Sequence, residues 1–127
     1  MGTFGGERVC LKLDSAKAKP TEQTVRRFAK RLEAELGFQQ VYYNPKESYN
    51  GRVWSKTVLS NSKDHPGWEL LVDHTPQYSN LECRIRHSTS PDSSNTELAK
   101  RVTEIMQKLF PGAAPYDCTI CRGIAAP

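Results

Sequence analysis

The chain lacks long hydrophobic runs and the signature motifs of common enzymes. Nowhere do 18 apolar residues follow one another, so we expect no membrane-spanning helix and no membrane partner. The segment Met1–Arg8 has no apolar run, so we expect no secretory signal. We therefore expect a cytoplasmic location. The chain has no glycine-rich phosphate loop, no His-Glu-x-x-His helix and no Gly-x-Ser-x-Gly elbow. These absences favour a non-catalytic protein over an enzyme.

The composition is that of one globular domain. The 127 residues are 37% hydrophobic and 25% charged, enough to bury a core without disulfides or a metal. The net charge of +4 permits nucleic acid or an acidic protein as partner. Without a secretory signal, we expect the four cysteines to be reduced. They are Cys10, Cys83, Cys118 and Cys121.

Two segments have the spacing of amphipathic helices. The first is predicted from about Glu22 to Leu36, with Thr21 as its N-cap and Gly37 as a left-handed C-cap. The second carries Ser94 and Glu97 at capping-box spacing and stops at Pro111-Gly112. The apolar positions are Val25, Phe28, Ala29, Leu32 and Leu36 in the first, and Leu98, Val102, Ile105 and Leu109 in the second.

Alternating apolar and polar residues predict strands in the rest of the chain. Asn50-Gly51 is the strongest hairpin signal, because a type I′ turn needs positive φ at both central residues. It joins a weak strand, 46–49, to a better one, 52–59. The other expected strands are 8–13, 40–43, 68–74 and 81–88.

We therefore predict an α+β fold with the order β-α-β-β-β-β-α. A mostly antiparallel sheet of about five strands carries both helices on one face, as an alpha-beta sandwich. Residues 1–112 form this single domain, and 113–127 form a C-terminal extension that contains the Cys-x-x-Cys motif. The other face is expected to be solvated. Its expected residues are Lys12, Glu69, Asp73, Glu82, Arg84 and Arg86.

Residues 42–62 combine aromatic side chains with turn formers and polar residues. This composition suits a recognition loop, because Tyr and Trp provide a large contact area at a low cost in entropy. The alternative is that the aromatic residues are core or edge residues of an ordinary hairpin. The candidate binding residues are Tyr42, Tyr43, Tyr49, Arg52 and Trp54.

A second candidate surface is basic and suits RNA or DNA. Cations on one surface contact phosphates, and the tyrosines and Trp54 could stack on unpaired bases. The alternative is that these cations are only the solvated side of a helix, where Glu33 and Glu35 accompany them. The candidates are Arg26, Arg27, Lys30 and Arg31 on the first helix, and Arg84 and Arg86 on a strand.

Cys118-x-x-Cys121 has the spacing for zinc binding or thiol exchange. A zinc site needs two more ligands, which would have to come from other cysteines and histidines of the sheet. The alternative is two incidental thiols. His74 and His87 with Asp73 could do acid–base chemistry if the fold brought them together.

The sequence thus predicts a small non-catalytic adaptor, inhibitor or accessory domain that binds a macromolecule, most plausibly another protein. A basic RNA- or DNA-binding module is the alternative. A protein that uses the Cys118/Cys121 pair with zinc or as thiols is a more distant one, and otherwise no cofactor is expected.

Overall fold

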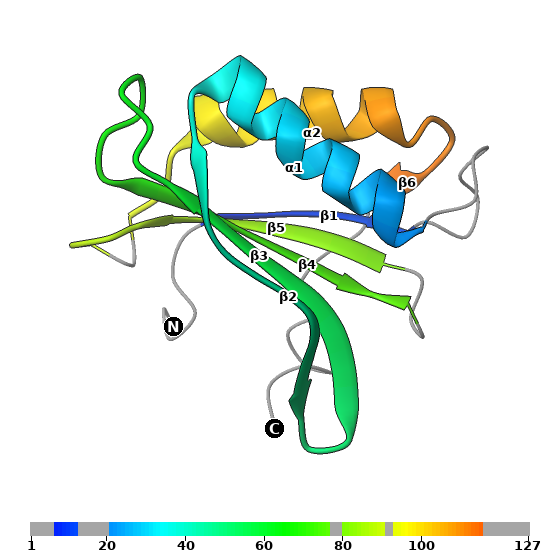
Figure 1. Cartoon of the computed structure of the whole chain (residues 1–127). Coiled ribbons are helices and arrows are strands. Elements are labelled where there is room, and N and C mark those ends of the chain that lie inside the picture. Colours follow the sequence, from blue (N-terminus) through cyan, green and yellow to red (C-terminus); the bar gives the residue numbers. More distant parts are fainter. Residues whose placement is uncertain (1–6, 13–20, 77–79, 91–92, 116–127) are drawn as a thin grey trace.

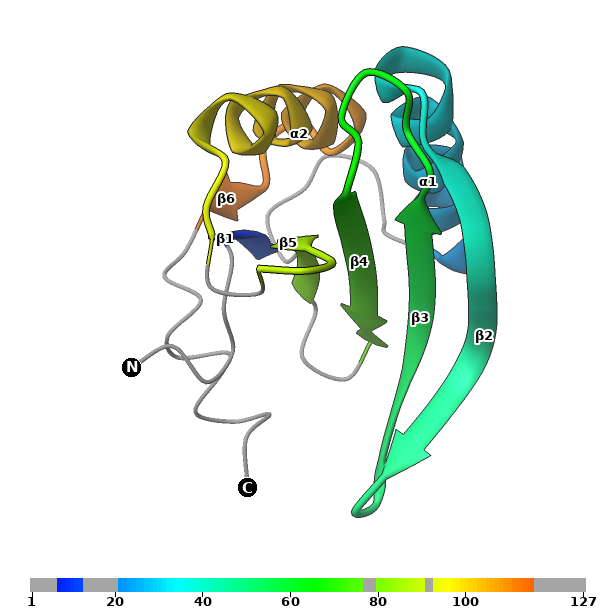
Figure 2. The same ribbon diagram turned by 90° about the vertical axis from the view of Figure 1, so that its left-hand side faces the viewer.

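The computed structural model describes residues 7–12, 21–76, 80–90 and 93–115. Figures 1 and 2 show both helices on the same side of one sheet. The predicted α+β class and element order are confirmed, and a two-residue strand, β6, follows the second helix. The elements are β1 Glu7–Lys12, α1 Glu22–Leu36, β2 Gln39–Tyr49, β3 Arg52–Ser60, β4 Trp68–Thr75, β5 Asn80–His87, α2 Thr96–Leu109 and β6 Ala114–Pro115.

Helix α1 begins and ends where the sequence predicts. The Thr24 N–H donates to the Thr21 hydroxyl at 3.2 Å, and the Thr21 N–H donates to the Thr24 hydroxyl at 2.9 Å, which forms a reciprocal capping box. Gly37 ends the helix with φ 77°, a left-handed conformation that glycine adopts without strain. Phe38 then packs into the core. The buried face of α1 is the predicted one: Val25, Phe28, Ala29, Leu32 and Leu36.

Helix α2 starts one residue later than its capping signal indicated. The N-cap is Asn95, whose side chain accepts a hydrogen bond from the Leu98 N–H at 3.0 Å, so the assignment of Ser94 is wrong. Asparagine caps as well as serine, and here the Glu7 carboxylate also accepts from the Asn95 N–H at 2.6 Å. This contact ties the start of α2 to β1.

The sheet has the order β2-β3-β4-β5-β1-β6, and all neighbours are antiparallel. Strand β1 lies between β5 and β6, so the first described strand is an inner one. Strand β2 forms the edge at the other end. Both helices pack their apolar sides against one face of the sheet. The core lies between the helix layer and the sheet.

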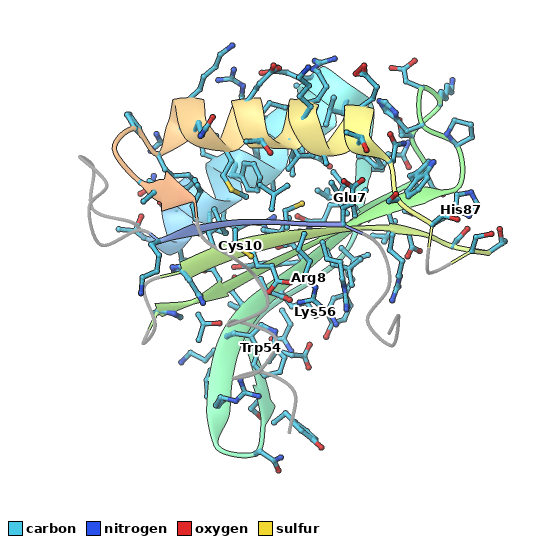
Figure 3. The ribbon with its side chains drawn as sticks, turned by 180° about the vertical axis from the view of Figure 1, so that it is seen from behind. Glu7, Arg8, Cys10, Trp54, Lys56 and His87 are labelled. Carbon is cyan, nitrogen blue, oxygen red and sulfur yellow. The ribbon has the colours of Figure 1, made fainter. Side chains whose placement is uncertain are left out.

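The opposite face, called here the helix-free face, carries Arg8, Cys10, Trp54 and Lys56, as Figure 3 shows. Strand alternation and register add Leu71, Asp73, Asn80, Glu82 and Arg84 to it. The expectation that this face is solvated is wrong at its centre. Four of its residues are almost completely buried: Cys10 and Leu71 at 3% exposed, Glu82 at 7% and Asn80 at 8%.

Strands β2 and β3 form a long hairpin that extends beyond the other strands, away from the helices (Figure 1). Asn50 and Gly51 have φ values of 51° and 75°, so the predicted turn with positive φ is confirmed. The predicted segments 40–43 and 46–49 belong to one strand. An irregularity in the register between Asn44 and Glu47 separates them, at the position where Pro45 lacks an N–H group.

No helix within the described part of the chain has the length and apolar content needed to cross a membrane.

Candidate protein-binding site

The exposed large hydrophobic side chains of the described residues all lie on the β2–β3 hairpin. Elsewhere in the described residues, large apolar side chains are buried or half-buried. Exposed apolar surface that is concentrated on one projecting element is typical of a contact surface. The four residues and their exposed fractions are Val41 52%, Tyr42 43%, Tyr49 56% and Val53 44%.

On the helix-free side, the hairpin surrounds a shallow hollow of about 500 Å³, called here the hairpin hollow. The Tyr42 hydroxyl donates to Glu47 at 2.6 Å, and this hydrogen bond raises the pKa of Tyr42. The Asn44 amide donates to the same carboxylate at 3.4 Å. Contacts within the hairpin therefore hold Tyr42 and Glu47, two lining residues of the hollow, in place. The lining residues are Tyr42, Glu47, Ser48, Tyr49, Trp54, Lys56 and Val58.

A row of charged residues continues from this hollow across the helix-free face. The register places Lys56 opposite Asp73 and Asp73 opposite Glu82. On the other side of Glu82, Cys10 of β1 lies opposite it. Arg8 donates to Glu82 at 2.5 Å, and both side chains are almost fully buried. The row therefore brings two carboxylates side by side and surrounds them with cations.

Asp73 is a half-buried acid of this row with a raised pKa. Burial, followed by the charge of Glu82, raises its pKa from 3.8 to about 6, although Lys56, Arg84 and a hydrogen bond from Trp54 act in the opposite direction. Among the described residues, its Oδ1 has no hydrogen-bond partner. Because Trp54 also lines the hairpin hollow, Asp73 connects the charged row to the aromatic surface.

Tyr43, a predicted binding residue, anchors the hairpin to α1. Its hydroxyl donates to Glu22 at 2.7 Å, and the guanidinium of Arg26 lies 3.8 Å from the centre of its ring. Arg26 also donates to Thr57 at 3.1 Å and to Gln40. These contacts fix the hairpin to the first turns of α1. A second hollow, of about 310 Å³, lies beside them, lined by Glu22, Pro45, Lys46, Val53, Trp54, Ser55 and Pro76.

The remaining predicted residues of the hairpin lie near its tip. Trp54 is half-buried between the two hollows and lines both of them. Arg52 is half-buried and opposite Tyr49 at the start of β3. Tyr42, Tyr49 and Trp54 therefore line the hairpin hollow together, and Arg52 lies beside it, opposite Tyr49.

The predicted basic residues do not form one surface. Arg26 is held against the hairpin, Arg31 pairs with Glu35 at 2.5 Å, and Arg27 and Lys30 are exposed on α1. The strand cations lie on the opposite face of the sheet. There, Arg84 is half-buried, and burial is the main cause of its lowered pKa, while Arg86 pairs with Glu69 at 2.9 Å.

The histidines and Asp73 also lie apart. His74 and His87 sit at opposite ends of the β4–β5 ladder, opposite Leu81 and Trp68 respectively. His87 packs edge-to-face on Trp68, with ring centres 5.0 Å apart. Asp73 faces the helix-free side, whereas His74 is buried on the helix side with its Nδ1 3.9 Å from Glu22. This arrangement does not assemble an acid–base pair.

The cysteines differ from one another. Cys83 is a free thiol in the core, and burial raises its pKa, so it is unreactive. Cys10 is disulfide-bonded, which contradicts the expectation of four reduced thiols. The predicted metal ligands Cys118 and Cys121 lie outside the described residues, and within those residues no cluster of metal-binding side chains occurs.

Sequence reasoning placed Asp73, Glu82 and Arg84 on one face of the sheet, but it missed that Lys56 and Arg8 join the two carboxylates in the charged row. Its members stand at alternating positions of four strands, and each strand alone shows only ordinary alternation. The signal exists only once the register is known. No family model, curated protein or solved structure matches this chain.

Proposed function

We propose that this protein is a non-catalytic accessory domain that binds another protein through its β2–β3 hairpin. The observation that carries the proposal is the gathering of the exposed large hydrophobic side chains of the described residues on this one element. Burial of such side chains is the main source of binding free energy at protein interfaces. The proposed function requires no metal ion or cofactor.

Contacts hold two tyrosine side chains of the hairpin in place without a partner protein, which supports the same proposal. Tyr42 is tied to Glu47, and Tyr43 is held between Glu22 and Arg26. Side chains that already occupy their bound positions lose less conformational entropy on association. The aromatic groups of the hairpin are thus suited to act as rigid anchors, which is how Tyr and Trp act at interface hot spots.

We propose contact through side chains rather than addition of a strand to the edge of the sheet. Strand β2 is an edge strand, but its register is irregular between Gln40 and Tyr42 and again between Asn44 and Glu47. Pro45 removes one N–H donor from the same strand. Bulges and proline are the devices by which edge strands avoid pairing with other strands.

Site-specific photo-cross-linking tests the proposal. A benzoylphenylalanine placed at Tyr49 should link to one discrete protein in extract of the native source, and excess unmodified protein should compete with the link. The same group at Gln107, exposed on α2, is the matched control. Equal cross-linking from both positions, or none from Tyr49, would contradict the proposal.

A parallel measurement addresses the nucleic-acid alternative. Binding to a generic single-stranded oligonucleotide should be absent at low salt if the hairpin binds protein rather than nucleic acid. Binding that weakens steeply as salt increases would instead support a basic module, because cation–phosphate contacts release counterions.

A further inference from the structure

The second hollow contains a buried hydroxyl group that makes no hydrogen bond. Ser55 lines this hollow and is only 3% exposed, yet its Oγ has no hydrogen-bond partner among the described residues. The register places Ser55 of β3 opposite His74 of β4, which is 4% exposed. Nδ1 of His74 likewise has no hydrogen-bond partner in the part of the chain that the structure describes. Buried polar groups are almost always paired, so these two indicate that a bound group supplies their partner.

Glu22, the first residue of α1, brings a negative charge to the same hollow. Its Oε2 accepts a hydrogen bond from the Tyr43 hydroxyl, whereas its Oε1 lies 3.9 Å from Nδ1 of His74, beyond hydrogen-bond range. Burial is the main cause of the lowered pKa of His74, so its ring is uncharged at neutral pH and does not balance Glu22. No lysine or arginine of the described residues forms an ion pair with Glu22.

These groups match the three N–H donors of a primary ammonium group. Two acceptors 3.9 Å apart allow one nitrogen to lie about 2.9 Å from both, so one ammonium can donate to Glu22 and to His74 with its ring proton on Nε2. The remaining N–H is then available for the Ser55 hydroxyl. A water molecule could pair with the neutral groups, but it would leave the charge of Glu22 without a counter-ion.

A guanidinium group suits the second hollow less well than an ammonium group. Its parallel N–H groups bind best to both oxygens of one carboxylate, and Tyr43 already occupies Oε2 of Glu22. An ammonium is a compact charge that needs only one oxygen.

The apolar walls of the second hollow suit the stem of a lysine side chain. The methylene stem of lysine packs readily along apolar surface while its ammonium reaches a polar group. Lys46 also lines the hollow, but it is exposed, so its like charge can turn into the solvent. The apolar lining residues are Pro45, Val53, Trp54 and Pro76.

We propose that the second hollow receives a lysine side chain of the partner protein, whose ammonium group is bound by Glu22, Ser55 and His74. The inference rests on the proposed function, because it assigns to the partner one residue that the β2–β3 hairpin recognises. It also explains why two neighbouring polar groups are buried without a hydrogen-bond partner in the unbound protein.

An NMR titration with Nα-acetyl-lysine methylamide tests the second hollow without the partner protein. The amide signals of Val53 and Ser55 and the indole signal of Trp54 should shift to saturation. The same probe acetylated on its Nε, which removes the positive charge, should cause no shift. Saturating shifts with both probes, or shifts with neither, would overturn the proposal.

Two carboxylate variants show whether Glu22 binds the ammonium group. Glu22→Gln should raise Kd for the lysine probe at least about tenfold, because a charge-assisted hydrogen bond is lost. Glu104→Gln, on the exposed side of α2, is the matched control and should leave Kd unchanged. Equal effects of the two substitutions would contradict the assignment.

The Ser55→Ala variant separates a ligand contact from a structural role. It removes a buried hydroxyl that has no partner, so the unbound variant should unfold at a higher temperature than the wild type. Its Kd for the lysine probe should nevertheless rise at least about threefold, because one acceptor is lost. A lower unfolding temperature, or an unchanged Kd, would contradict the proposal.

This proposal and the proposed function can fail separately. If the lysine probe does not bind but position 49 still cross-links to one protein, the lysine site is wrong and the hairpin remains the contact surface. If the probe binds but position 49 forms no cross-link, the second hollow takes a free amine, and a partner lysine as its source is wrong. Binding of the probe together with a cross-link that excess lysine probe weakens supports both.

Discussion

At Asp73, burial and the negative charge of Glu82 both disfavour the ionised form of the side chain. Burial and Glu82 raise its pKa from 3.8 to about 6. A carboxyl group with a higher pKa in the folded state binds a proton more readily there than in the unfolded state. Its contribution to stability is therefore greatest below about pH 4 and is lost as the pH rises through about 6.

The Asp73→Asn substitution should stabilise the protein at pH 7.5 by about 1–3 kcal/mol, because each pKa unit corresponds to about 1.4 kcal/mol. At pH 4 the two proteins should unfold at the same urea concentration. Urea denaturation at both pH values checks this, with Glu69→Gln, a partly exposed ion-pair partner of Arg86, as control. A stabilisation of equal size at both pH values would contradict the assignment of the raised pKa.

Tyr42 and Tyr43 are neighbours in sequence with different roles, and a matched pair of substitutions separates them. Tyr43→Phe removes the hydroxyl that donates to Glu22 and should cost about 1–2 kcal/mol, since the acceptor is charged and the site is partly buried. Tyr42→Phe removes a hydroxyl on an exposed side chain and should change the stability far less than Tyr43→Phe does. Thermal denaturation of the two variants measures the difference, and equal losses would contradict an anchoring role for Tyr43.

At the scale of the elements, local signals were sufficient for the helices and the turn. The N-cap Thr21, the C-cap Gly37 and the Asn50-Gly51 turn act within a few residues of their own position, so the sequence contains them directly. Ser94 failed because Asn95, one residue further, offers an equivalent cap and gains a contact from Glu7. Glu7 is distant from Asn95 in sequence, so their contact cannot be predicted from the residues around the helix start.

Two glycines with positive φ should respond differently to alanine. At Gly51, in the hairpin turn, an alanine Cβ would meet no atom within 4 Å, so Gly51→Ala should cost only the left-handed backbone penalty of about 1–2 kcal/mol. At Gly67 the added Cβ would also lie 2.6 Å from Nε2 of His87, which packs on Trp68. We therefore expect Gly67→Ala to be the more destabilising variant in urea denaturation. The reverse order would contradict the packing of His87.

At the scale of the whole molecule, the helix layer covers the core and the hairpin projects from it (Figure 2). Composition alone pointed to the aromatic hairpin as a candidate site. It could not show that Tyr43 faces α1, or that the α1 cations and Arg84 lie on opposite sides, because both depend on strand register and on the face that the helices cover. The positions of Lys56 and Arg8 beside Asp73 and Glu82 in the charged row could not be predicted for the same reason.

The affinity of paired variants for the protein cross-linked at Tyr49 tests the central claim, that the hairpin rather than the helix layer makes the contact. Tyr49→Ser combined with Val53→Thr should raise Kd at least about tenfold, since loss of about 1.4 kcal/mol of apolar burial has this effect. Arg27→Gln combined with Lys30→Gln, on exposed positions of α1, should change Kd less than about twofold. A large loss from the α1 pair with little change from the hairpin pair would contradict the account.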